Sequence, residues 1–273
     1  MFAVLTVEME ENLPAGRRAA LRLRPAKGLT WREELFRMAM FCHAKVTLCA
    51  EWREDIHKKR VGEALLQLKA RGARQVVLPR KWQDLARTVD LLPVNCRPAL
   101  EACGVQAVLE ACRGLDIPAG EACLAVYGTR LSSVASMQLL TLAKSLRTLR
   151  IYGEGNEALR NQLWRGCGIV DRGPMPENAP VLALLLAGGK APGQAQLTVD
   201  LSDGAGEGEG LLWTPQLVLP QGAQAKLPEG ASPVAFAAAL LQMGALQPRE
   251  IHVSRLDIPG TTQYNKEIVE NCF

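Results

Sequence analysis

The sequence predicts an α/β protein made of two α/β domains. Its 273 residues suit one large or two modest domains, since a domain takes about 100–200 residues. Hydrophobic residues make up 48% of the chain, charged residues 22%, and the net charge is +4, which excludes a largely disordered protein. Short apolar runs alternate with amphipathic stretches, and this alternation is typical of βαβ units in a mostly parallel sheet.

The first half contains three predicted strands and four predicted helices. Thr30 is the expected N-cap of the first helix, with Glu33 in its capping-box position. Gly72 is placed to end the second helix, and Gly104 to break the fourth. The strands are expected at residues 2–7, 46–49 and 75–78, and the helices at residues 31–41, 57–71, 82–89 and 98–112.

The segment Gly-Leu-Asp-Ile-Pro-Ala-Gly at residues 114–120 interrupts this pattern. It predicts a boundary between a basic N-terminal domain, residues 1–118, and a second domain, residues 119–273. Residues 1–120 carry 20 Lys and Arg against 14 Asp and Glu, and the rest carry 12 against 14. The excess of basic residues in the first 120 residues suits either a site for an anionic ligand or a solvated surface. Basic residues alternate with acids and no nucleic-acid motif is present, so we do not expect a nucleic-acid partner.

The second half continues the strand–helix alternation. Strands are expected at residues 122–127, 148–152, 168–171, 181–187, 196–200, 217–219 and 251–253, and helices at residues 132–146, 156–165, 233–246 and 264–271. The glycine-rich residues 203–210 lack the Lys-Ser/Thr of a phosphate loop and the spacing of an EF-hand. They are expected to form a surface loop.

The turn at residues 127–133 joins the first strand of this half to its helix. In an open parallel sheet, ligands bind outside the carboxyl ends of the strands, at turns of this kind. Gly128 suits the tight bend, and the following helix start offers N–H groups and a partial positive charge to a phosphate.

Residues 121–203 resemble the NAD(P)-binding Rossmann domain, in particular that of shikimate and methylenetetrahydrofolate dehydrogenases. The resemblance rests on the strand order, the acid after the second strand, Ala-Gly-Gly at 187–189 and Thr-Val-Asp at 198–200. It implies a Rossmann-like, mostly parallel sheet with helices on both faces and NAD or NADP as the cofactor. Glu154 would hold the ribose and favour NAD. The other expected cofactor-binding residues are Gly128, Thr129, Arg130, Ser132, Ser133, Gly188 and Gly189.

The sequence departs from the family's G-x-G-x-x-G fingerprint. Gly128 keeps the first glycine, whereas Arg130 and Ser133 replace the second and third. Ser133 is small enough for close helix packing. Arg130 either pairs with a phosphate or blocks the pocket.

Lys81 and Asp116 are the candidate catalytic residues. Residues 76–81, Val-Val-Leu-Pro-Arg-Lys, are similar to the strand-end Pro-x-Lys segment of shikimate dehydrogenases, whose lysine does acid–base work. Asp116 follows 35 residues later, near the position of the family's partner aspartate. The family's Asn-Thr-Asp context is missing before Asp116, so a solvated surface lysine remains the alternative for Lys81.

No metal and no membrane partner is expected. The eight cysteines form no C-x-x-C pair, and the separations of Cys96, Cys103 and Cys112 do not match common zinc sites. The three histidines are far apart in the sequence. No apolar run reaches the roughly 20 residues that span a bilayer, and no basic leader precedes the first strand. Reduced cysteines then indicate a cytoplasmic protein.

Two functions remain open at this point. The first is an NAD(P)-dependent oxidoreductase that acts on a small acid. The second is a non-catalytic Rossmann-like binding, regulatory or scaffold protein that has lost its cofactor, which the missing glycines favour. Both imply a small-molecule or nucleotide ligand, and the sequence leaves open whether the chain forms a homo-oligomer.

Overall fold

The predicted α/β class is confirmed, and the chain folds as two compact units. The computed structural model describes residues 1–11, 14, 16, 29–168, 181–186, 189–191, 195, 197–202, 207–208 and 212–257. The first unit comprises Met1–Cys96 and Leu219–Gln247, and the second comprises Arg97–Val218 and Pro248–Phe273.

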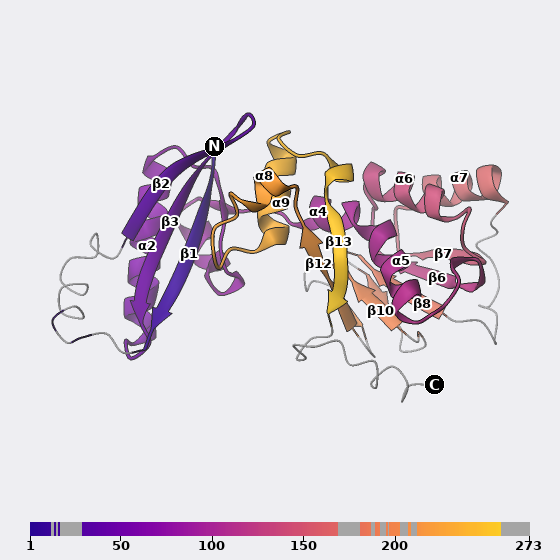
Figure 1. The fold of residues 1–273 in the computed structure, drawn as a ribbon, viewed down its shortest axis with the longest axis horizontal. Coiled ribbons are helices and arrows are strands. Elements are labelled where there is room, and N and C mark those ends of the chain that lie inside the picture. The colour runs from indigo at the N-terminus through magenta and orange to yellow at the C-terminus, as the bar shows by residue number, and fades with distance from the viewer. Residues whose placement is uncertain are drawn as a thin grey trace. The chain divides into compact units, whose positions relative to one another are not determined.

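The first unit is built on a five-stranded sheet (Figure 1). Its strands lie in the order β2 (Leu29–Phe36), β3 (Ala39–Cys49), β1 (Phe2–Glu10), β4 (Gln75–Val77) and β5 (Leu92–Pro93). Only the β2–β3 pair is antiparallel. One face packs against α2 (Glu54–Ala70), η2 (Arg80–Trp82) and α3 (Gln83–Thr88), where alternate residues of β1 and β3 meet one side of α2 in the core.

The helix predicted at residues 31–41 is wrong, because these residues form a β-hairpin. β2 pairs antiparallel with β3, and Arg37 turns the chain with a positive φ of 51°. β2 is an edge strand with mostly exposed side chains, so its charged residues imitate an amphipathic helix. The long-range pairing with β3 overrides that local preference.

The opposite face of this sheet is covered by the segment that returns late in the chain, with α8 (Gln221–Gln224) and α9 (Pro233–Gln242). Phe236 of α9 is fully buried, and its ring lies 5.3 Å from that of Phe41 and 6.0 Å from that of Phe2. Ser232 caps α9, since its hydroxyl accepts a hydrogen bond from the Ala235 N–H. The aromatic contact ties residues 219–247 to the first unit.

The second unit has a six-stranded sheet in the order β13 (His252–Asp257), β12 (Leu212–Val218), β10 (Leu197–Asp200), β8 (Val181–Leu185), β6 (Cys123–Tyr127) and β7 (Thr148–Tyr152). All neighbours are parallel except β12 and β13, as a Rossmann-like domain requires. The helices are α4 (Arg97–Ala102), α5 (Gly104–Gly114), α6 (Ser133–Leu142) and α7 (Glu157–Cys167).

These helices flank the sheet and adjoin one another. As predicted, helices flank the parallel sheet (Figure 1). α5 contacts β8, β10 and α6, and α6 contacts α7. The short helices η3 (Ala119–Glu121) and η4 (Pro248–Glu250) precede β6 and β13, and two-residue strands β9 (Lys190–Ala191) and β11 (Glu207–Gly208) pair separately.

The predicted boundary at residue 118 differs from this division. α4 and α5 belong with the second sheet, because α5 packs against its strands, and residues 219–247 return to the first unit. Local composition marks the change of pattern at 114–120, but it carries no information about which sheet a helix joins. Three further predictions lie outside the described residues. They are the strand at 168–171 (all but residue 168), most of the glycine-rich loop at 203–210, and the helix at 264–271.

Candidate functional site

The turn that the sequence singles out lies at the carboxyl end of β6. β6 has β7 on one side and β8 on the other, both parallel to it. The chain runs from β6 to β7 and then back past β6 to β8, which is the topological switch point where open α/β sheets bind ligands. The Tyr127 and Tyr152 rings stack here at the strand ends, with centroids 4.9 Å apart. Burial and the neighbouring Tyr152 raise the pKa of Tyr127.

Three backbone N–H groups of this turn are bonded within the protein. The Gly128 N–H donates to the Tyr152 carbonyl at 3.1 Å, and the Arg130 N–H donates to the Glu154 carbonyl at 2.9 Å. The Leu131 N–H donates to the Asn156 side-chain oxygen at 3.0 Å. The turn after β6 is therefore joined to the turn after β7.

Asn156 is the central residue of this junction. It is 3% exposed, and its side-chain Nδ2 donates to the Gly128 carbonyl at 2.8 Å and to the Gly153 carbonyl at 3.3 Å. The sequence predicted Asn156 as the N-cap of α7. It occupies that position, but its side chain makes no cap hydrogen bond there and binds the neighbouring turn instead. An asparagine before a helix signals a local cap, so the sequence did not indicate this role.

Glycines let the two turns approach closely. Gly153 has a φ of 110°, and a Cβ there would collide with the Gly128 carbonyl. Gly155 has a φ of 75°, and its Cβ would meet the Arg130 side chain at 2.6 Å. Arg130 itself adopts a φ of 48°, a conformation that favours glycine. In the fingerprint, a glycine lets the backbone approach a phosphate closely. Here Gly153 and Gly155 let the turn after β7 pack closely on the turn after β6.

Arg97 holds the same turn from the other side. Its Nη2 donates to the Thr129 carbonyl at 3.1 Å and to the Arg130 carbonyl at 2.7 Å. Its Nε donates to Glu101 at 2.6 Å, one helical turn along α4, and Glu101 is 1% exposed. The sequence offered only an Arg and a Glu spaced i,i+4, which is a common helix-surface pair.

The remaining predicted cofactor residues lie around this turn. The Ser132 hydroxyl accepts from the Ala135 N–H at 3.1 Å and so caps α6. Ser133, Glu154 and the Arg130 side chain are exposed. Gly189 is buried, and a Cβ there would collide with the Tyr127 carbonyl. Gly188 lies outside the described residues.

Lys81 and Asp116 belong to different units. Lys81 is exposed in η2, with its ammonium 5.0 Å from the Trp82 ring centroid. Asp116 is exposed and precedes the amino end of β6, whereas the Gly128 turn follows its carboxyl end. The pairing of Lys81 with Asp116 stays a prediction.

The cysteines and metal ligands can be placed for the described part of the chain. No group of three or more His, Cys, Asp or Glu there has the arrangement of a metal site. The described cysteines are free, and burial raises the pKa of Cys103 to about 12. Burial also raises the pKa of Cys42 and of Cys112, so these thiols are uncharged near neutral pH. Within the same residues, no helix has the length and apolar character to cross a bilayer.

No protein-family model matches this sequence, and no curated protein matches it. Among solved structures, the chain is similar to the hetero-hexameric glutamate dehydrogenase from Thermus thermophilus, Leu-bound form, with 12% identity and a TM-score of 0.28 over 99% of this chain and 72% of that chain. It is also similar to L-tryptophan dehydrogenase from Nostoc punctiforme, with 14% identity and a TM-score of 0.31 over 88% and 73%.

Proposed function

We propose that the protein is a non-catalytic Rossmann-like binding or regulatory protein, whose turn after β6 does not hold a dinucleotide. The supporting observation is that the Gly128 N–H donates to the last residue of β7, and the Arg130 and Leu131 N–H groups donate to the turn that follows it. In dinucleotide-binding domains, the pyrophosphate needs such N–H groups and the close backbone approach of the second glycine. The residues present here do not fit that group.

A rearrangement that freed these N–H groups would be costly. Asn156 is buried, and its amide satisfies a donor on Leu131 and an acceptor on Gly128. Each buried polar group left without a partner costs about 1–3 kcal/mol. Arg97 and its buried partner Glu101 hold the carbonyls of the same turn. The turn after β6 is therefore most stable with these bonds formed, and we call this conformation the closed turn.

The NAD(P)-dependent oxidoreductase is the second candidate, and one observation favours it. Arg130, Ser133 and Glu154 are exposed at the carboxyl ends of two adjacent parallel strands, which is where a phosphate and a ribose would lie. In that function Arg130 would pair with phosphate by a charge-assisted hydrogen bond. The narrower resemblance to shikimate and methylenetetrahydrofolate dehydrogenases would then identify a small acid as substrate.

Thermal unfolding with NAD, NADH, NADP and NADPH separates the two candidates. A ligand at 100 times its Kd stabilises the folded protein by about 2.7 kcal/mol. We expect no saturable shift with any of the four, and the same for Arg130→Gly, because Asn156 and Glu154 still bond the N–H groups. A saturable shift in the natural chain contradicts the proposal. A shift only in Arg130→Gly would mean that the arginine, and not the bonded turn, excludes the dinucleotide.

A further inference from the structure

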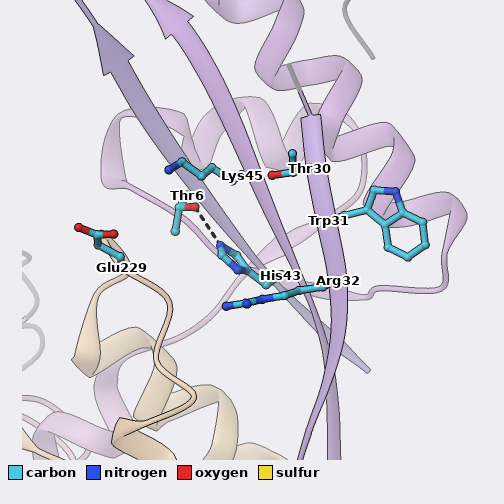
Figure 2. Close-up of a pocket in the computed structure, with 7 residues that line it drawn as sticks. All are labelled: Thr6, Thr30, Trp31, Arg32, His43, Lys45 and Glu229. Carbon is cyan, nitrogen blue, oxygen red and sulfur yellow. Dashed lines mark hydrogen bonds between the residues drawn. The ribbon is translucent and has the colours of Figure 1, made fainter. Parts of the chain in front are cut away.

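A polar hollow of about 320 Å³ lies in the first unit, on the sheet face that α9 covers only in part. It forms where the aromatic packing of Phe236 on Phe2 and Phe41 ends and the strands continue with polar residues. Figure 2 shows the lining residues, which are Thr6, Thr30, Trp31, Arg32, His43, Lys45 and Glu229.

Strand register explains why these side chains gather. Arg32 of β2 pairs with His43 of β3, and Lys45 of β3 lies between Thr30 of β2 and Thr6 of β1. Directly paired residues in neighbouring strands point to the same face of a sheet, so two polar rows lie side by side. The Trp31 ring points away from the hollow in Figure 2 and stacks on the Arg71 guanidinium, 3.3 Å from it.

Each cation at the hollow has an acidic neighbour. The Lys45 ammonium donates to Glu8 at 2.9 Å, and both side chains are more than 40% exposed. The Arg32 Nε lies 2.7 Å from Glu34, which is also 3.1 Å from Lys226. The Arg32 and Lys45 side chains are 67% and 41% exposed, so solvent weakens both pairs and they orient the cations without satisfying all of their donors. Each cation therefore keeps donors for a ligand oxyanion.

His43 lies between the two cations. Its Nε2 is 3.0 Å from the hydroxyl of the buried Thr6, and the side chain is half-buried. Burial and the nearby Arg32 lower the pKa of His43, Glu34 acts in the opposite direction, and Lys45 lowers it further. At neutral pH the ring is therefore uncharged. An anion placed between Arg32 and Lys45 offsets their effect and favours the charged ring.

We propose that this hollow binds the oxyanion group of a small ligand, a phosphate, sulfate or carboxylate, between Arg32 and Lys45, and that His43 takes up a proton on binding. The exposed Thr30 hydroxyl supplies a further hydrogen bond. Glu229, on the connection between α8 and α9, faces these residues across the hollow (Figure 2). A ligand hydroxyl or amino group therefore suits that side. The volume lies at the small end of ligand pockets, which span about 300–1,000 Å³.

This inference is independent of the closed turn in the second unit, because every residue it uses belongs to the first unit. Sulfate is the appropriate probe, since it stays a dianion through the pH range in which histidine titrates. Any pH dependence of its binding then reports on the protein. A parallel titration with acetate above pH 6 shows whether the hollow binds a carboxylate as well as a sulfate-like oxyanion.

The experiment follows the ring signals of His43, His57 and His252 by NMR in the full chain, as sulfate replaces chloride at constant ionic strength. We expect a saturable shift of the His43 signal alone, a higher pKa of His43 with sulfate bound, and tighter binding at pH 6 than at pH 8. His57, buried and 2.9 Å from the Cys49 carbonyl, is the internal control.

The matched variants are Arg32→Gln and Lys45→Met, with Arg53→Gln as control, because the Arg53 side chain is 84% exposed and lies outside the hollow. Loss of either cation should weaken binding about tenfold or more, and Arg53→Gln should leave it unchanged. His43→Gln should abolish the pH dependence. The proposal is overturned if His43 shows no saturable shift, if all three histidines shift alike, or if Arg53→Gln weakens binding as much as the other two.

Discussion

At the scale of single residues, Asn156 joins two turns of the second unit, although its place before a helix suggests only a local cap. Its buried side-chain amide accepts from the Leu131 N–H and donates to the Gly128 and Gly153 carbonyls, so it bonds both the turn after β6 and the turn after β7. The sequence identified the Gly128 turn as the place of interest. It could not identify the partner, because a side chain that bonds across two turns leaves no local periodicity.

Asn156→Ala should destabilise the protein by about 2 kcal/mol, because the buried Gly128 carbonyl and the part-buried Leu131 N–H both lose their partner. Urea unfolding measures the change. Asn161→Ala is the matched control, since Asn161 is exposed on α7 and its loss should change stability by less than about 0.5 kcal/mol. Equal effects of the two substitutions would mean that Asn156 does not hold the junction.

His43 makes stability depend on pH. Its pKa in the folded protein is lowered from 6.5, so the unfolded chain binds more protons between the two values. This contribution is fully present above pH 6.5 and is lost as pH falls toward the lowered value. Urea midpoints at pH 7.5 and 5.5 should therefore fall further for the natural chain than for His43→Gln. Parallel decreases would show that His43 does not titrate as described.

At the scale of elements, β6, β7, β8 and β10 were predictable because each is a short apolar run closed by glycine or a polar residue. β12 was predicted only at its end, residues 217–219, because polar residues and a proline interrupt its earlier part. β6 and β7 lie where the sequence placed them. The β2–β3 hairpin was not predictable in the same way. Its edge strand is charged and mostly exposed, so only the pairing with β3 defines it.

Gly153→Ala should be among the most destabilising substitutions at these turns. The left-handed conformation alone costs about 1–3 kcal/mol for a residue with a side chain, and the new Cβ would also collide with the Gly128 carbonyl. Gly166→Ala is the control, because Gly166 lies in α7 with open space around it. This substitution should stabilise the protein by about 0.5–1 kcal/mol. Thermal unfolding measures both. A neutral Gly153→Ala would contradict the packing of the two turns.

At the scale of the whole molecule, the chain leaves the first unit at residue 96 and returns to it for Leu219–Gln247. The sequence predicted two α/β domains but placed one boundary at residue 118. It could not show the return, because α9 reads as an ordinary apolar helix wherever its partner sheet lies. Long-range contacts assign it, above all that of Phe236 with Phe2 and Phe41.

Phe236→Ala should destabilise the first unit by about 3–5 kcal/mol, the cost of an aromatic side chain removed from a core. Phe236→Leu keeps much of the apolar surface and should cost clearly less. Chemical unfolding followed by the near-ultraviolet signal reports on both. If Phe236→Ala unfolds like the natural chain, residues 219–247 do not complete the first sheet.

The central claim is that the N–H groups of Gly128, Arg130 and Leu131 are already bonded within the protein. Residue-resolved amide hydrogen exchange without ligand tests it most directly. The account predicts slow exchange at Gly128, Arg130 and Leu131. It predicts fast exchange at Ser133, an exposed residue at the first position of α6, where the N–H has no intrahelical partner. Exchange at the first three as fast as at Ser133, or protection that arises only when NAD or NADP is added, would contradict it.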